Sequence, residues 1–149
     1  MFSIMNIFKY IIARDIVVRH KIRNTRLARE MAIYLLTNIG KEFSYKSLKE
    51  TFGVGSVNTI ISLISYFEDS YLLFTVPKFS HFLKSQIKNP KKIYSVDNGM
   101  AAVNSASFSE DRGRMLENAV FLHLRRQLTI SGKRIVIKPA WKWFTENSR

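Results

Sequence analysis

The order of short helical patterns and glycine stops between residues 24 and 99 constrains the fold more than any other feature. The first pattern has apolar residues at helical spacing, at Leu27, Met31, Leu35 and Ile39. Asn24-Thr25 supplies a capping side chain before this pattern, and Gly40 follows it. We therefore predict a helix over about residues 26–39.

Two more helical patterns follow and meet at a tight turn. One starts at Ser44, a good N-terminal cap, and ends at Gly53, because glycine permits the left-handed backbone of a helix stop. The next starts at Ser56. Its apolar stripe consists of Val57, Ile60, Ile61, Ile64 and Phe67. Only three residues separate these helices, so a helix-turn-helix is predicted.

Two strand patterns come after the third helix. Tyr71–Val76 is rich in aromatic and β-branched residues and is closed by Pro77, and Ile93–Val96 follows a Lys-rich loop. Three helices and then a hairpin are the pattern of a winged helix-turn-helix. The alternative is a small helical bundle with an unrelated hairpin.

The last third of the chain predicts one helix and one strand. Residues 115–128 have a helical stripe, and Arg134–Lys138 is a strand candidate. The expected fold class is therefore α+β, mostly helical, with a winged helix-turn-helix followed by a truncated helix-strand segment. We divide the chain into an N-terminal helical linker or docking segment (1–22), a winged helix-turn-helix domain (23–99) and a partial C-terminal lobe (100–149).

Composition narrows the class of protein. The chain contains no cysteine, which removes disulfides, thiolate nucleophiles and cysteine-bound metals, so a reducing, cytoplasmic location is expected. The longest apolar runs are far short of the roughly 20 residues that span a bilayer. The apolar beginning carries Lys9 and Arg14, which argues against a signal peptide. An amphipathic helix packing on a neighbour is expected there, with an interfacial membrane helix as the minor alternative.

Positive charge is concentrated outside the middle of the chain. The net charge is +13, which favours polyanionic partners. Residues 1–40 carry +5, residues 41–77 carry −1, residues 78–99 carry +4 and residues 100–149 carry +5. The predicted hairpin loop is therefore strongly basic for its length.

Four stretches of sequence resemble a known family. They are RDIVVRHKIRN (14–24), YLLFTVPKFS (71–80), NPKKIYSVD (89–97) and EDRGRMLEN (110–118). The residues of these stretches and their order along the chain are similar to those of predicted AAA-type ATPases of bacteria and archaea, whose C-terminal region is domain of unknown function 4143. The resemblance implies an ATPase module upstream, a winged helix, and a C-terminal lobe similar to restriction-endonuclease folds. Toward the end the chain departs from that pattern, because the expected Asp-containing hairpin is missing and residues 139–144 are unlike it.

The residues present do not support ATP hydrolysis by this chain. A phosphate-binding loop needs the spacing G-x-x-x-x-G-K-[ST]. The two Gly-Lys pairs, at residues 40–41 and 132–133, lack both the first glycine and the final Ser or Thr. We therefore expect no ATPase activity from the chain alone, and no cofactor.

Nuclease and metal chemistry also lack the required residues. Glu117 stands at the position of the family's helix glutamate, but the only later acid is Glu146, whereas a nuclease needs two or three converging carboxylates. The simpler interpretation is that Glu117 suits the dipole of a first helical turn. The histidines, His20, His81 and His123, are too far apart in sequence to suggest a zinc site or a triad. The chain is therefore not expected to be an enzyme.

DNA binding through the wing is the preferred prediction. The third helix would place Asn58, Thr59, Ser62 and Tyr66 near bases, although it contains no Lys or Arg. The predicted phosphate contacts come from the hairpin lysines, at Lys78, Lys84, Lys88, Lys91 and Lys92. This arrangement favours weak, sequence-independent binding.

Two other functions stay open at this point. The basic first forty residues suit docking to an acidic protein surface, so an ATPase module or a second copy of the chain is the alternative partner. A functionless remnant of a truncated or frameshifted gene is the third. No membrane partner is expected.

Overall fold

The computed structural model describes residues 3–78, 80–82, 84, 89–104 and 112–131. Over these residues the chain forms six α-helices, one π-helix and a three-stranded antiparallel sheet. The elements in order are α1 (Ile4–Tyr10), π-helix η1 (Ile11–Val18), α2 (Thr25–Thr37), β1 (Glu42–Phe43), α3 (Tyr45–Phe52), α4 (Val57–Asp69), β2 (Leu73–Pro77), β3 (Lys91–Ser95), α6 (Asn98–Asn104) and α7 (Arg112–Ser131). The predicted mostly helical α+β class is confirmed.

Side-chain caps begin the three helices of the helix-turn-helix region, as predicted. Asn24 Oδ1 accepts a hydrogen bond from the Leu27 amide at 3.0 Å. Ser44 forms a reciprocal capping box with Ser47 at the start of α3, and Gly53 ends that helix at φ 62°. Ser56 Oγ accepts from the Asn58 amide at 3.1 Å at the start of α4. Each cap satisfies an amide that has no partner within its helix.

The sheet has the strand order β1-β3-β2, and both pairings are antiparallel. Leu73 pairs with Ser95 and Pro77 with Lys91, so β2 and β3 form the arms of the wing. The short β1, between α2 and α3, adds to the other edge of β3. This sequence of helix, strand, two helices and hairpin is the winged helix-turn-helix arrangement.

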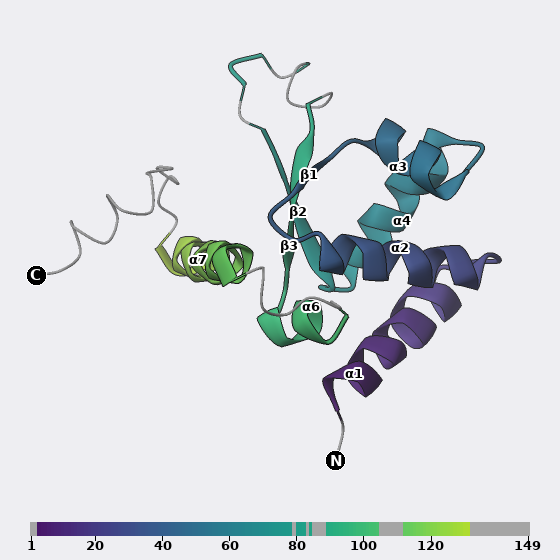
Figure 1. The fold of residues 1–149 in the computed structure, drawn as a ribbon, viewed down its shortest axis with the longest axis horizontal. Coiled ribbons are helices and arrows are strands. Elements are labelled where there is room, and N and C mark those ends of the chain that lie inside the picture. Colours follow the sequence, from purple (N-terminus) through teal and green to yellow (C-terminus); the bar gives the residue numbers. More distant parts are fainter. Residues whose placement is uncertain (1–2, 79, 83, 85–88, 105–111, 132–149) are drawn as a thin grey trace, which may run out of the picture.

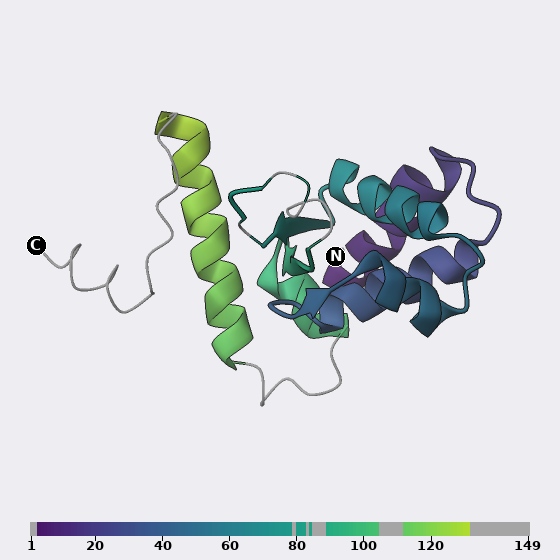
Figure 2. The same cartoon turned by 90° about the horizontal axis from the view of Figure 1, so that it is seen from above.

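The sheet lies between two groups of helices. Helices α2, α3 and α4 lie on one side of it and α7 lies on the other, as both views show (Figures 1 and 2). The core joins the first group to the sheet and to the N-terminal helices. Its largest fully buried side chains are Phe8, Ile16, Met31, Leu35, Leu36, Leu48, Ile60, Ile64, Phe67, Leu72, Leu73 and Ile93. Burial of this apolar surface is the main force that holds α1 and η1 against the helix-turn-helix.

Three details differ from the sequence predictions. On α4, Leu63 is buried, whereas Ile61, which we assigned to the apolar stripe, is 40% exposed. Residues 98–104 form helix α6, which we did not predict, and Asp97 Oδ1 caps it by accepting from the Met100 amide at 3.0 Å. Strand β1 was not predicted, because two residues are too few to show a periodic pattern. The strand predicted at Arg134–Lys138 lies outside the described residues.

The N-terminal segment is helical and packs on a neighbour, as expected. Phe8, Ile12 and Ile16 are its buried residues, and they join the core under α2. Within the described part of the chain, no helix combines the length and the apolar character needed to cross a membrane.

Candidate nucleic-acid interface

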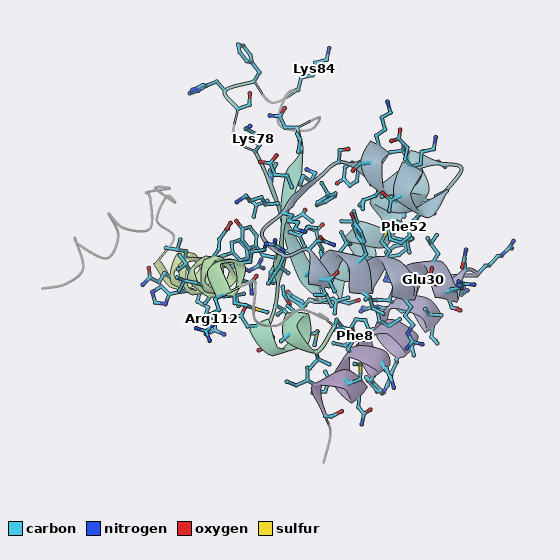
Figure 3. All side chains as sticks on the ribbon, viewed as in Figure 1. Phe8, Glu30, Phe52, Lys78, Lys84 and Arg112 are labelled. Atoms are coloured by element: carbon cyan, nitrogen blue, oxygen red, sulfur yellow. The ribbon has the colours of Figure 1, made fainter. Side chains whose placement is uncertain are left out.

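The wing carries its free cations at the tip. Lys78 and Lys84 are both exposed, and their side chains lie at the end of the hairpin farthest from α6 (Figure 3). Lys78 donates its backbone amide to the Pro90 carbonyl at 3.2 Å, which closes the hairpin just beyond the last strand pair. Phe82, between the two lysines in sequence, is 75% exposed. The tip therefore presents two ammonium groups and an aromatic ring to solvent.

Two of the five predicted wing lysines are engaged within the fold. The Lys91 ammonium lies 5.8 Å from the centre of the Tyr45 ring, at a distance that suits a cation–π contact. Lys92 Nζ forms an ion pair with Glu117 Oε1 at 2.8 Å. Both side chains are half-buried, so neither offers its full charge to a phosphate. Lys88 lies outside the described residues.

The outward face of α4 is polar and carries no cation. Asn58, Thr59 and Ser62 are exposed on this face. Tyr66 is different, because its ring stacks on His20 with centroids 3.7 Å apart and an angle of 12° between the planes. Tyr66 therefore packs on the segment after η1 and does not share the open face of the other three residues.

Acidic groups end α4. Glu68 Oε1 accepts from both the backbone amide and the hydroxyl of Thr75, at 2.9 and 2.7 Å, which fastens the helix to β2. Asp69 is exposed beside it. A carboxylate at this end would repel a phosphate backbone, so the first turns of α4 suit a contact with phosphate better than its last turn does.

Glu117 lies at the junction of α7 and the sheet. Its Oε1 accepts from Lys92 Nζ and from the Tyr94 hydroxyl, both at 2.8 Å. Burial raises the pKa of Tyr94 above its usual range, and the hydrogen bond to Glu117 and the charge of that carboxylate raise it further. Among the described residues no three His, Cys, Asp or Glu side chains gather as a metal site would require. Helix α7 begins at Arg112, so Glu117 lies beyond its first turn and the helix-dipole interpretation is wrong. The contacts of Glu117 are those of a residue that attaches a helix to a strand.

Asn118, next to Glu117, is fully buried and binds the backbone of β3. Its Oδ1 accepts from the Ser95 amide at 2.8 Å, and its Nδ2 donates to the Ser95 carbonyl at 3.1 Å and to Asn98 Oδ1 at 2.7 Å. Asn98 Nδ2 in turn donates to the Met115 carbonyl at 3.1 Å. Three segments, β3, α6 and α7, are thereby joined through one side-chain amide.

Aromatic rings complete the contact between α7 and the sheet. Phe121 stacks on Tyr94 with centroids 4.1 Å apart and planes 10° apart. The guanidinium carbon of Arg125 lies 3.7 Å from the centre of the Phe74 ring. These residues cover the face of the sheet that is turned away from α2–α4, so that face is not available to a nucleic acid.

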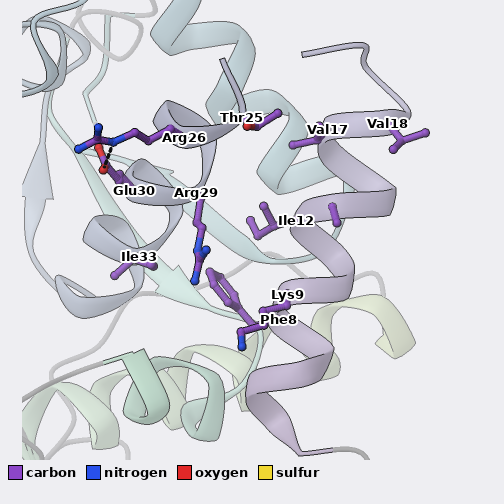
Figure 4. A pocket seen from close by; sticks show the side chains of 11 residues that line it. Phe8, Lys9, Ile12, Val17, Val18, Thr25, Arg26, Arg29, Glu30 and Ile33 are labelled. Atoms are coloured by element: carbon purple, nitrogen blue, oxygen red, sulfur yellow. Dashed lines mark hydrogen bonds and ion pairs between the residues drawn. The ribbon is translucent and has the colours of Figure 1, made fainter. Parts of the chain in front are cut away.

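A groove opens between the N-terminal helices and α2, away from the wing. It has a volume of about 830 Å³ (Figure 4). Its walls are mainly apolar, and its lining residues are Phe8, Lys9, Ile12, Ala13, Val17, Val18, Thr25, Arg26, Arg29, Glu30 and Ile33. We predicted docking for this segment from its charge and not from a groove, because a groove between helices has no local sequence signal.

The chain matches one family model and parts of two longer proteins. A family model described as Domain of unknown function (DUF8612) matches residues 2–111. The chain is similar to "Uncharacterized protein MJ1544" of Methanocaldococcus jannaschii, with 37% identity over 126 residues that cover 76% of this chain and 26% of that protein. An uncharacterized protein of Haemophilus influenzae is 24% identical over 125 residues, covering 81% of this chain and 31% of that protein. No solved structure matches.

Two consequences follow from these matches. The chain spans between about a quarter and a third of the length of the curated relatives that it matches. The matched family is a domain of unknown function, as the resemblance implied, but its number is 8612 and not 4143. Glu117 and Asn118 lie beyond the residues that the family model matches.

Proposed function

This chain belongs to the DUF8612 family, and we propose that it is a non-catalytic winged-helix module that binds the nucleic-acid backbone weakly and without base specificity. The proposal rests mainly on the position of Lys78 and Lys84. Both are exposed at the wing tip, and neither has a carboxylate partner among the described residues. Lysines in such a position contact phosphates and release condensed counterions from DNA.

The outward face of α4 supports binding without sequence specificity. Bidentate contacts of Arg or Lys to guanine are the commonest specific contacts to bases, and α4 carries neither residue type. Asn58, Thr59 and Ser62 can donate to phosphate or sugar oxygens from the first two turns. The helix would then fix the orientation of the duplex while the wing supplies the charge.

The wider setting is part of the same proposal. The resemblance to AAA-type ATPases supports a module that works beside an ATPase domain in a longer protein. The relatives, of which this chain spans 26% and 31%, leave room for such a domain. These 149 residues lack the spacing of a phosphate-binding loop, and Glu117 is engaged by Lys92 and Tyr94, so we assign ATP or DNA cleavage to another part of the longer protein or to a partner.

Fluorescence anisotropy with two unrelated labelled duplexes, across a salt series, tests this function. We expect similar micromolar affinity for both duplexes and a steep loss of binding with salt. Lys78→Gln together with Lys84→Gln should reduce the slope of log K against log salt by roughly two. The matched control, Lys21→Gln with Arg23→Gln, removes the same charge from the loop before α2 and should change the slope less. Equal slopes for parent and wing variant, or no binding at low salt, would refute the proposal.

A further inference from the structure

We infer that the groove between the N-terminal helices and α2 is a docking site for an acidic amphipathic helix of a protein partner. This site lies outside the wing and α4, so it goes beyond the proposed nucleic-acid binding. Its walls are the N-terminal helices α1 and η1 on one side and α2 on the other, and a further helix is the element that fills a groove between helices by packing ridges into grooves.

The floor of the groove is apolar. Ile12 and Phe8 are buried at its base, whereas Val17 and Ile33 are only half-buried along its walls. Val18, at one end, is 70% exposed (Figure 4). An exposed valine beside half-buried apolar walls presents surface that a partner's apolar stripe can cover.

The rim of the groove is basic and selects the charge of the partner. Lys9 and Arg29 have no carboxylate partner within the described part of the chain. The one acidic lining residue, Glu30, is already paired with Arg26 at 2.7 Å. Lys9 and Arg29 both approach Phe8 in the close view (Figure 4). Two unpaired cations beside apolar walls match a helix that carries Glu or Asp along the edges of its apolar stripe.

Local backbone geometry supports a binding role for this wall. Residues Ile11–Val18 form a π-helix, and the amides of Arg19 and Ile22 donate to the carbonyls of Arg14 and Val17, five residues earlier. Stretches of π-helix are rare and occur frequently at functional sites. Four of the groove's lining residues, Ile12, Ala13, Val17 and Val18, belong to this stretch.

A second copy of the chain is a poor occupant by comparison. Each copy carries a net charge of +13, so two copies repel one another overall, and a symmetric contact through this groove would bring two basic rims together. The described α-helices of the chain also carry few acidic residues along their exposed faces. Charge complementarity therefore favours a different, acidic partner.

The test uses the full chain and a fluorescein-labelled, hydrocarbon-stapled helical peptide with leucines at positions i, i+4, i+7 and i+11 and glutamates beside them. A second peptide has lysine in place of each glutamate. Lys9→Glu with Arg29→Glu should weaken binding of the glutamate peptide by about tenfold or more and should gain binding of the lysine peptide. Both residues are exposed, so the variant is expected to fold, and circular dichroism checks this.

The control variant reverses two exposed charges elsewhere, at Lys46 of α3 and Arg126 of α7, and should bind the glutamate peptide within about twofold of the parent. Val18→Ser should weaken binding of the glutamate peptide to the parent and of the lysine peptide to the groove variant. It removes an apolar contact and changes no charge. The inference is overturned by no binding of the glutamate peptide, by equal binding to parent and groove variant, or by a homodimer in light scattering that Val18→Ser dissociates. Loss of DNA binding in the wing variant would leave this result unchanged, so the two proposals fail separately.

Discussion

Asn118 of α7 occupies the place of a neighbouring strand beside Ser95 of β3. Its amide oxygen accepts from the Ser95 N–H and its amide nitrogen donates to the Ser95 carbonyl, at 2.8 and 3.1 Å. On the same edge of β3, two residues earlier, the Gly40 amide donates to the Ile93 carbonyl, and the Lys41 carbonyl accepts from the Ile93 amide. The Asn118 side-chain amide therefore continues the hydrogen-bond ladder along this edge of β3, beyond the residues that Gly40 and Lys41 cover. It thereby attaches α7 to the sheet.

Replacing Asn118 should destabilise the protein strongly. Asn118→Ala removes both partners of the buried Ser95 backbone groups, so we expect the free energy of unfolding to fall by roughly 2–4 kcal/mol. Urea unfolding followed by circular dichroism measures the loss, and hydrogen exchange of the Ser95 amide should become faster. Leu116→Ala on the exposed face of the same helix should stay within about 0.5 kcal/mol of the parent. Unchanged exchange at Ser95 would show that the side chain does not protect this edge.

Glu117 should contribute much less than Asn118, although the two are adjacent. Glu117→Gln keeps an oxygen that can accept from Tyr94 and Lys92 and removes only the charge of a partly exposed ion pair. Such pairs contribute about 0–1 kcal/mol, so the free energy of unfolding should fall by less than about 1 kcal/mol. The same urea titration decides this. A loss as large as that of Asn118→Ala would mean that the carboxylate has a role beyond attaching α7.

Alkaline pH should weaken the contact between α7 and the sheet through Tyr94. Burial, the hydrogen bond to Glu117 and the nearby carboxylate raise the pKa of Tyr94, so the folded state favours the neutral phenol. That stabilisation is complete below the unfolded pKa of about 10 and is lost as pH rises above it, because the unfolded chain ionises first. Stability measured between pH 8 and pH 11 should therefore fall more steeply in the parent than in Tyr94→Phe.

Some of the alkaline loss should remain in that variant. Burial, followed by the charge of Glu68, also raises the pKa of Tyr45, so this second tyrosine has the same direction of effect. Tyr45→Phe combined with Tyr94→Phe should flatten the profile further. Identical slopes in the parent and both variants would remove the tyrosines as the source of alkaline sensitivity.

Local chemistry made the helix-turn-helix predictable. Asn24, Ser44 and Ser56 cap helices through atoms only two or three residues away, and Gly53 stops a helix through its own backbone freedom. Such signals are contained in a few consecutive residues, so the sequence shows them directly. The wing was equally clear, because Pro77 and the Lys-rich loop bound two strand patterns.

Contacts between distant segments limited the prediction of the candidate site. Lys92 was assigned to phosphate, but its partner Glu117 is 25 residues away, and no local pattern joins them. Asn118 had no signal of its own beyond its place in the stretch EDRGRMLEN. The assignment of Ile61 to the core failed for a related reason: the apolar stripe of α4 is wider than the face that its neighbours cover, and only the packing of α3 and β2 selects Leu63 instead.

Gly40 should be intolerant of a side chain because of its backbone angle. Its φ of 74° lies in the left-handed region, and its amide donates to the Ile93 carbonyl at 2.7 Å, which fixes that conformation. Gly40→Ala should therefore lower the free energy of unfolding by about 1–2 kcal/mol. Gly55→Ala is the matched control, because an added Cβ there meets nothing within 4 Å and its φ is not positive. Equal stability of the two variants would refute the argument.

Replacing Tyr66 should affect the stability of the protein and not its affinity for DNA. The sequence placed it near bases with Asn58, Thr59 and Ser62, whereas in the structure its ring stacks on His20. We expect Tyr66→Ala to lower the free energy of unfolding by at least about 1 kcal/mol, because an aromatic pair and its buried area are lost. Anisotropy at a temperature where both proteins are folded should show the same DNA affinity for the variant and the parent.

Replacing Thr59 and Ser62 with alanine should have the opposite effect: weaker DNA binding with little change in stability. Both residues are exposed on the open face of α4, so their loss should leave stability within about 0.5 kcal/mol of the parent. If they touch the backbone of a duplex, the double variant should bind DNA more weakly than Tyr66→Ala does. The reverse order of affinities would mean that the ring leaves His20 when DNA binds, and that the base-facing surface of α4 extends to its third turn.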